Sequence, residues 1–120
     1  KRLLEENFWV TRREIVYRKE GLLKQTSAAA EANKSVEEVI IPAFDGNEYR
    51  VEVLNIETQV DDHGVTEGWL SGRLANDPES IVHLAFYGER ESGSVSSSNL
   101  GIEISYQPRE DGQVTVNEID

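Results

Sequence analysis

Polar and apolar residues alternate along several short stretches of the chain. In the segment 49–53, Tyr, Val and Val are separated by Arg and Glu, and the same period of two recurs at 82–86, 102–106 and 114–116. This period places one set of side chains on a buried face and the other in water, so each segment is predicted to be a β-strand. The residues expected to be buried are Tyr49, Val51, Val53, Val82, Leu84, Phe86, Ile102, Ile104, Tyr106, Val114 and Val116.

The alternation changes phase after Val53. Leu54 and Ile56 continue on the opposite parity, which in one continuous strand indicates a β-bulge. Nearer the start of the chain, residues 8–18 are rich in β-formers and predict one or two strands. Another strand is expected at 36–41, and Pro42, which has no N–H to donate, ends it or places it at a sheet edge.

Turn signals separate these segments. Asp45-Gly46, Asp61 to Gly64 and Asp111-Gly112 are typical of tight reversals, and the last pair is a hairpin signal. Within the central stretch 68–98, a turn over 76–80 and another at Gly88 separate three strands that begin near Trp69, Ile81 and Gly93. Such short connections predict antiparallel neighbours, because a parallel crossover takes a dozen or more residues.

Residues 21–35 differ from the rest because they are rich in Ala. They predict a short helix or a loop, and the absence of a clean 3.6-residue apolar stripe favours a partly ordered connection. About eight short strands with turn signals every 8 to 12 residues indicate an all-β fold. We therefore expect an antiparallel β-sandwich, jelly-roll-like, or a partly open barrel, with one short helix or loop near residues 21–35.

Length and charge limit the classes of protein. A chain of 120 residues fits one domain, 1–120, with residues 1–12 as a candidate N-terminal arm. The net charge of -11 argues against a nucleic-acid partner, although residues 1–24 alone carry +3 and form a basic segment. No apolar run approaches the roughly 20 residues that span a bilayer, so no membrane span is expected. Met is absent even at position 1, which is typical of a processed product or a fragment.

Catalytic and metal-binding patterns are scarce. Cys is absent and the two histidines, His63 and His83, are far apart, so we expect no zinc site and a structural role for His83. Asp61, Asp62 and Glu67 have calcium-type oxygen ligands but no EF-hand spacing, and solvated turns explain them better. The serines at 94–98 have no nearby base and no nucleophile-elbow pattern. No catalytic residue, metal ligand or cofactor site is therefore predicted.

The aromatic residues fit two interpretations. They could stack on carbohydrate from one sheet face, or fill the core, where each would bury about 150 to 250 Å². We favour the core for most of them. The residues concerned are Trp9, Trp69, Phe86, Tyr87 and Tyr106.

A specific order of motifs runs through about nine tenths of the chain. Ile41-Pro42 leads to Asp45-Gly46 and a strand, and a Trp-x-x-Gly-Arg pattern follows at 69–73. Gly72 and Arg73 complete that pattern, and Tyr49 and Val51 lie on the strand before it. The later motif residues are Asp77, Pro78, Ser80, Val82, Leu84, Gly88, Gly93, Ser94, Val95, Tyr106, Pro108, Asp111, Gly112, Val116 and the closing Glu118-Ile119-Asp120. In this order the chain resembles the pro-domain that precedes the catalytic domain in reprolysin-type, or adamalysin, zinc metalloproteases, including bacterial members.

The resemblance implies a non-catalytic N-terminal pro-domain of a secreted or cell-envelope protease. Such a domain assists folding and keeps the enzyme latent, and its partner is the downstream metalloprotease domain of the same precursor. Two departures are visible: the chain has no cysteine to place on a catalytic zinc, and it has no His-Glu-x-x-His motif. The alternative is an accessory β-sandwich module that recognises carbohydrate or protein through one sheet face.

Overall fold

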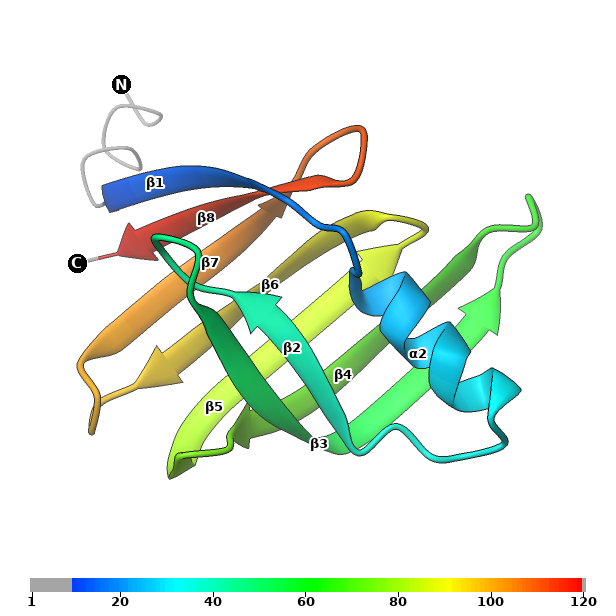
Figure 1. Cartoon of the computed structure of the whole chain (residues 1–120), viewed down its shortest axis with the longest axis horizontal. Coiled ribbons are helices and arrows are strands. Elements are labelled where there is room, and N and C mark those ends of the chain that lie inside the picture. The colour runs from blue at the N-terminus through cyan, green and yellow to red at the C-terminus, as the bar shows by residue number, and fades with distance from the viewer. Residues whose placement is uncertain (1–9, 120) are drawn as a thin grey trace.

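A computed structural model describes residues 10–119, which form eight strands and one helix (Figure 1). The elements in chain order are β1 (Val10–Tyr17), α2 (Leu22–Glu31), β2 (Glu38–Pro42), β3 (Glu48–Val60), β4 (Thr66–Leu74), β5 (Asp77–Tyr87), β6 (Arg90–Ser97), β7 (Ile102–Pro108) and β8 (Gln113–Ile119). The expected all-β class, with about eight strands and one short helix, is confirmed. Trp9, Asp120 and most of the candidate arm 1–12 lie outside the described residues.

All eight strands belong to a single antiparallel sheet. Its order is β1-β8-β7-β6-β5-β4-β3-β2, so the chain from β2 to β8 is an up-and-down meander and β1 adds to the far side of β8. The sheet curls until its two edge strands, β1 and β2, approach each other (Figure 1). Of the architectures expected from the sequence, this corresponds to the partly open barrel.

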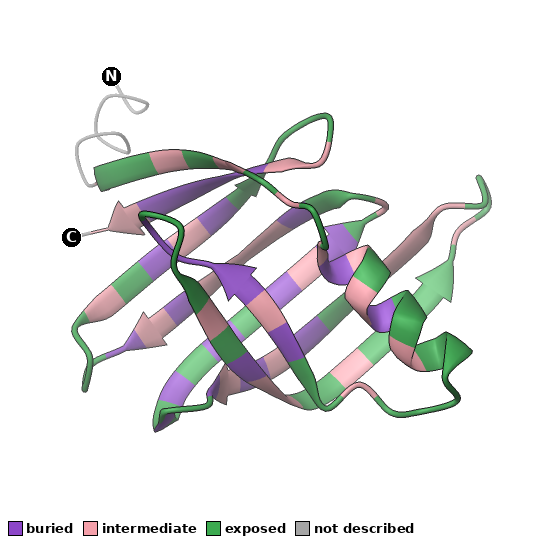
Figure 2. Cartoon of the chain, viewed as in Figure 1, coloured by how far each residue is buried: buried purple, intermediate pink, exposed green. Residues whose placement is uncertain are grey.

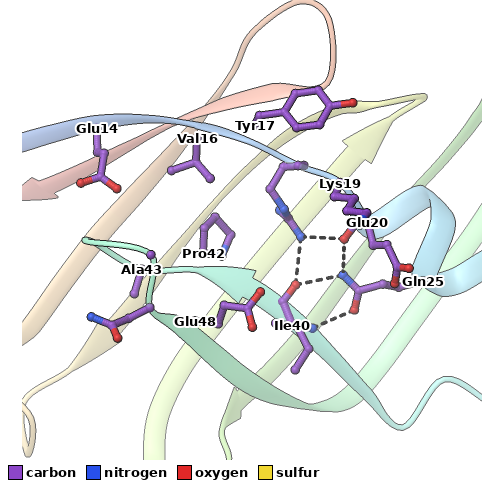
Figure 3. Close-up of a pocket in the computed structure, with 13 residues that line it drawn as sticks. Glu14, Val16, Tyr17, Lys19, Glu20, Gln25, Ile40, Pro42, Ala43 and Glu48 are labelled. Carbon is purple, nitrogen blue, oxygen red and sulfur yellow. Dashed lines mark hydrogen bonds between the residues drawn. The ribbon is translucent and has the colours of Figure 1, made fainter.

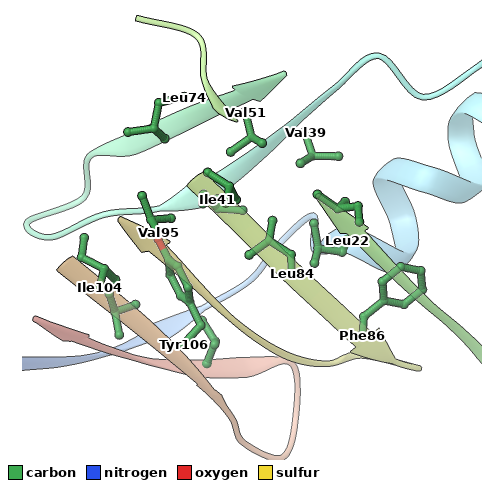
Figure 4. Close-up of a cluster of buried hydrophobic side chains, with 14 of the residues drawn as sticks. Leu22, Val39, Ile41, Val51, Leu74, Leu84, Phe86, Val95, Ile104 and Tyr106 are labelled. Atoms are coloured by element: carbon green, nitrogen blue, oxygen red, sulfur yellow. The ribbon is translucent and has the colours of Figure 1, made fainter. Parts of the chain in front are cut away.

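The predicted alternation places the core on the concave face of the sheet. Buried and exposed residues alternate along the central strands, and the inward side chains converge in the interior (Figures 2 and 4). Val82, Leu84 and Phe86 are buried as expected, and His83 between them is exposed. The core cluster comprises Leu22, Val39, Ile41, Phe44, Val51, Leu70, Leu74, Val82, Leu84, Phe86, Val95, Ile104, Tyr106, Val114 and Val116. The fully buried members come from β2 to β8, from the β2–β3 turn and from the helix, and Val16 of β1 packs against them as a partly buried residue.

The predicted β-bulge is confirmed in β3. The register between β3 and β4 shifts between Val53 and Asn55, which leaves Leu54 as the extra, exposed residue. Beyond the bulge, Ile56 pairs with Leu70 and packs against the core. The change of phase in the sequence therefore marks the point where β3 re-aims its side chains.

The predicted turn at Asp45-Gly46 and the predicted hairpin turn at Asp111-Gly112 both form. All four residues have positive φ, between 59° and 77°, which suits the small or short polar side chains found there. The turn expected over 76–80 is shorter than predicted, since β5 already begins at Asp77, opposite Leu74. Asp77 and Ser80 are buried there. Hydrogen bonds to Ser97 and to the backbone of Leu74 hold this part of β5 extended.

The Ala-rich segment forms helix α2 instead of the partly ordered connection that the weak apolar stripe favoured. Leu22 and Thr26, one turn apart, are its two buried residues, so a narrow stripe is enough to hold it against the sheet. The N-cap, Gly21, has no side chain to satisfy the first free N–H groups. A side chain from the sheet, described below, performs that role.

Candidate functional site

A groove runs along the seam where β1 and β2 face each other without pairing (Figure 3). Its volume is about 460 Å³. Its walls come from β1, from the segment leading to α2, from α2 and from the β2–β3 hairpin. They combine the polar or charged Glu14, Lys19, Glu20, Gln25 and Glu48 with the apolar Val16, Ile40, Pro42 and Ala43. The groove is the opening of the barrel.

Side chains satisfy the outer edge of β2 at this seam. The Gln25 amide accepts a hydrogen bond from Ile40 N–H (2.8 Å) and donates one to Ile40 C=O (2.9 Å), as a neighbouring strand would. Arg18 also donates to Ile40 C=O, at 2.9 Å. Pro42 has no N–H, and its carbonyl accepts the Tyr106 hydroxyl at 2.6 Å. These contacts protect the edge of β2 against pairing with another strand.

A buried ion pair lies beneath the seam. Arg18 and Glu91 form a salt bridge in which their side chains are only 10% and 5% exposed. The second Glu91 oxygen accepts the backbone N–H of Leu22 and so caps α2 from β6. Burial raises the pKa of the Glu91 carboxyl, and Arg18 and the Leu22 N–H oppose that rise. This network, which engages both Glu91 oxygens, fixes the helix to the sheet.

A second buried acidic residue, Asp77, organises the opposite end of the barrel. Its carboxylate accepts hydrogen bonds from the Ser97 hydroxyl and from Asn99 Nδ2, the latter at 3.0 Å. These hydrogen bonds lower the pKa of the Asp77 carboxyl, and the bond from Ser97 has the largest effect. Ser80 Oγ donates to Asp77 C=O (2.6 Å) and accepts from Leu74 N–H (2.7 Å). Every contact is internal, which indicates a structural role.

The outer face of β3, β4 and β5 has a different character. Trp69 lies on this face and is 47% exposed, and Tyr87 is 40% exposed. Leu54 and Ile81, at 57% and 56%, are also exposed on these strands. The expectation that the aromatics fill the core is therefore correct for Phe86 and Tyr106 and wrong for Trp69 and Tyr87. Trp69 shares its parity with Glu67, Ser71 and Arg73, and this polar alternation turns the indole outward.

The neighbours of Trp69 on the β5 side are small. The register partner of Trp69 on β5 is Ala85, and the partner of Ala85 on β6 is Ser92. Two shallow hollows, of about 620 and 310 Å³, meet at Trp69 and Ala85. The larger one, which we call the Trp69 hollow, is lined by Asn55, Ile56, Glu57, Trp69, Leu70, Ser71, His83, Leu84, Ala85 and Gly93.

A row of polar side chains, three of them serines, crosses the sheet beside this hollow. Its members are partners in the strand register from β3 to β1: Asn55, Ser71, His83, Ser94, Ser105, Asn117 and Arg13. The serines reach only a short distance from the sheet, so Trp69 projects above them. Around the hollow, the outer face thus combines the exposed Trp69 ring with shorter polar side chains, an arrangement suited to binding.

The cations of β3 and β4 on the outer face are already paired within the chain. Arg73 Nε lies 2.8 Å from a Glu52 oxygen, and Arg50 Nε lies 3.6 Å from a Glu38 oxygen. Near Trp69 the carboxylates of Glu57 and Glu67 remain, together with Asp61, whose pKa is lowered by the Tyr87 hydroxyl. The surroundings of Trp69 are therefore predominantly acidic.

The motif residues of the suspected family are mostly fold determinants in this chain. A Cβ on Gly72 would lie 2.1 Å from Glu52 C=O, and one on Gly93 would lie 2.2 Å from His83 C=O, so both sites need close backbone approach. Ser80 is buried in the Asp77 network, Arg73 pairs with Glu52, and Pro78 is exposed at the start of β5. The strands do not bring all these residues together in one site, and Trp69 is the motif residue with a large, exposed apolar side chain on the outer face.

The histidines and acidic turns form no metal site in the part of the chain that is described. His63 lies in the β3–β4 turn, where its backbone N–H donates to an Asp61 carboxylate oxygen at 2.9 Å. His83 lies on the outer face. Within residues 10–119, no three His, Asp or Glu side chains gather in a way that could hold a metal ion. The one helix in this range is not long and apolar enough to cross a membrane.

Comparison of the chain with protein-family models, with curated proteins and with solved structures gives no match.

Proposed function

We propose that this chain is the non-catalytic N-terminal pro-domain of a secreted or cell-envelope zinc metalloprotease. In this proposal it assists the folding of the downstream protease domain and keeps it latent by binding to it. The order of motifs from Ile41 to Asp120 supports the family, as described above. The observation that supports a binding role is the half-exposed Trp69 at the centre of the outer face of β3–β5.

An exposed aromatic ring of this kind is a typical anchor for a protein interface. Tryptophan is enriched among the few residues that contribute most of the binding energy at interfaces. Because the chain has no cysteine to ligate a catalytic zinc, latency would arise from complementary surfaces that cover the substrate cleft.

The test adds the purified domain to the mature protease and measures peptide hydrolysis at low and high ionic strength. The enzyme is the one whose gene continues past Asp120 into a His-Glu-x-x-His domain. We expect saturable inhibition. Absence of both binding and inhibition at tens of micromolar would refute latency by this domain, as would a gene that does not continue into such a domain.

Trp69 also favours a second candidate, an accessory module that binds carbohydrate. Its ring stands beside Asn55, Ser71 and His83, whose polar groups resemble those that hold sugar hydroxyls. A screen of the domain against immobilised glycans distinguishes the two functions. Specific retention of a glycan that depends on Trp69, without inhibition of the protease, would favour the accessory module.

A further inference from the structure

The Trp69 hollow combines an aromatic wall with an acidic rim. Its base is formed by the small side chain of Ala85, by Gly93 and by the backbone of Leu84, whose side chain lies in the core, and the indole of Trp69 forms one side. Glu57 is the register partner of Trp69 on β3, and directly opposed residues of antiparallel strands have Cβ atoms about 5 Å apart. Glu67 lies two residues before Trp69 on the same face. An aromatic ring with carboxylates beside it is chemically matched to a cation.

We propose that the Trp69 hollow binds an arginine side chain on a basic surface of a protein partner. The planar guanidinium would stack on the indole and direct its N–H groups to Glu57. Tryptophan is the strongest partner in cation–π contacts, and arginine suits both stacking and bidentate contact with a carboxylate. The inference rests on the proposed function, since the protease domain is the partner expected there.

The charges around the hollow favour this occupant over a neutral one. Arg73 and Arg50 on this face are neutralised by Glu52 and Glu38. Glu57 makes no ion pair with any residue in the range 10–119. Arg90 and His83 are the groups that would oppose a cation. Arg90 lines the smaller hollow on the other side of the ring, so it leaves the Glu57 side free.

Net charge points in the same direction. A domain with a net charge of -11 attracts basic surfaces over distances of about a Debye length, and it repels acidic ones. The edge of β2 is protected by side chains, so a partner is not expected to add a strand there. The outer face of the sheet is the binding surface that remains. A basic protein surface with one projecting arginine matches both the charge and the shape of this face.

The test uses nuclear magnetic resonance of the labelled domain titrated with N-acetyl-arginine amide, a probe for the side chain alone. We expect saturable shifts at the Trp69 indole N–H and at the Ala85 amide, at tens of millimolar probe. N-acetyl-citrulline amide has the same shape without the charge, and it should bind several-fold more weakly. Equal shifts with the two probes, or shifts centred elsewhere, would overturn the inference.

Variants sharpen this test. Trp69→Ala should weaken binding of the arginine probe about tenfold, measured from the shift of the Ala85 amide. Glu57→Gln should weaken it about two- to fivefold. Glu110→Gln is the matched control, because Glu110 is an exposed acid in the β7–β8 turn, and it should change nothing. N-acetylglucosamine serves as the carbohydrate probe, and shifts at Trp69 with this sugar but not with arginine would also overturn the inference.

The outcomes separate the inference from the proposed function. If the arginine probe binds at Trp69 but the domain does not inhibit the protease, the cation site stands and the pro-domain function fails. If the domain inhibits the protease but the arginine probe does not bind at Trp69, the function stands and this inference fails.

Discussion

Removal of the Glu91 charge should destabilise the domain by leaving Arg18 unpaired in the interior. Glu91→Gln retains a carbonyl oxygen that can accept the Leu22 N–H, so the cap of α2 survives while the ion pair is lost. Breaking one side of a buried pair costs about 3 to 5 kcal/mol. We expect about 3 kcal/mol, the lower end, because Arg18 keeps its bonds to the carbonyls of Ile40 (2.9 Å) and Glu20 (3.3 Å).

The complementary variant, Arg18→Met, predicts a specific pH dependence. The pKa of Glu91 is already raised by burial above its ordinary value of 4.5, and loss of Arg18 removes the main opposing effect. A raised folded pKa favours folding at low pH, and that contribution is lost as pH rises through the folded pKa. The cost of Arg18→Met should therefore be large near pH 7 and shrink as the pH falls through the raised pKa of Glu91.

Urea unfolding followed by circular dichroism measures both effects, with the double variant closing a thermodynamic cycle. We expect a coupling energy of about 1 to 3 kcal/mol between Arg18 and Glu91. Additive single variants, or a cost of Arg18→Met that is independent of pH, would show that the two charges are not paired in the folded interior.

Three further predictions concern the fold. Gly93→Ala should cost about 3 kcal/mol or more in urea unfolding, because φ is +147° and a Cβ would meet the His83 carbonyl at 2.2 Å; wild-type stability would contradict the close approach. Phe86→Ala should cost about 3 to 5 kcal/mol through lost burial and a cavity, and a cost below about 1 kcal/mol would contradict its place in the core. Asp77→Asn should flatten the loss of stability in acid, since the pKa of Asp77 is lowered by Ser97 and its contribution is lost as pH falls through the folded pKa; an unchanged pH profile would disprove this role.

Local features of the fold were predictable because their causes are local. The alternation at 82–86 specifies which side of β5 is buried, and the phase change at Leu54 specifies the bulge. The pairs Asp45-Gly46 and Asp111-Gly112 specify turns through their tolerance of positive φ. Each of these signals is complete within a few residues.

The closure of the barrel was not predictable, because it depends on contacts between distant residues. Gln25 pairs with Ile40 across 15 positions, and Arg18 pairs with Glu91 across 73. One signal was present: Glu91 shares the inward parity of Gly93 and Val95, so a charged residue was placed among core positions. Nothing in the sequence indicated which charge would meet it.

The exposure of Trp69 could have been read from its own strand. Its neighbours on the same parity, Glu67 and Ser71, are polar, whereas Leu70 and Leu74 on the other parity are apolar. General preference places tryptophan in cores, and that preference outweighed the local pattern in the prediction. Where a strand alternates clearly, the alternation specifies which face of the sheet each residue lies on. A large apolar residue on the polar face is then a candidate binding residue.

The central claim is that this domain binds the downstream protease domain through the face that contains Trp69. The most direct measurement compares the affinity of that protease domain for the wild-type chain, for Trp69→Ala and for Tyr17→Ala. Tyr17 is a matched control, since it is an aromatic residue, 68% exposed, on β1 at the other end of the sheet. We predict that Trp69→Ala weakens binding at least about tenfold, as expected for an interface anchor, and that Tyr17→Ala leaves it unchanged. Equal affinity for all three chains, or a loss confined to Tyr17→Ala, would contradict the claim.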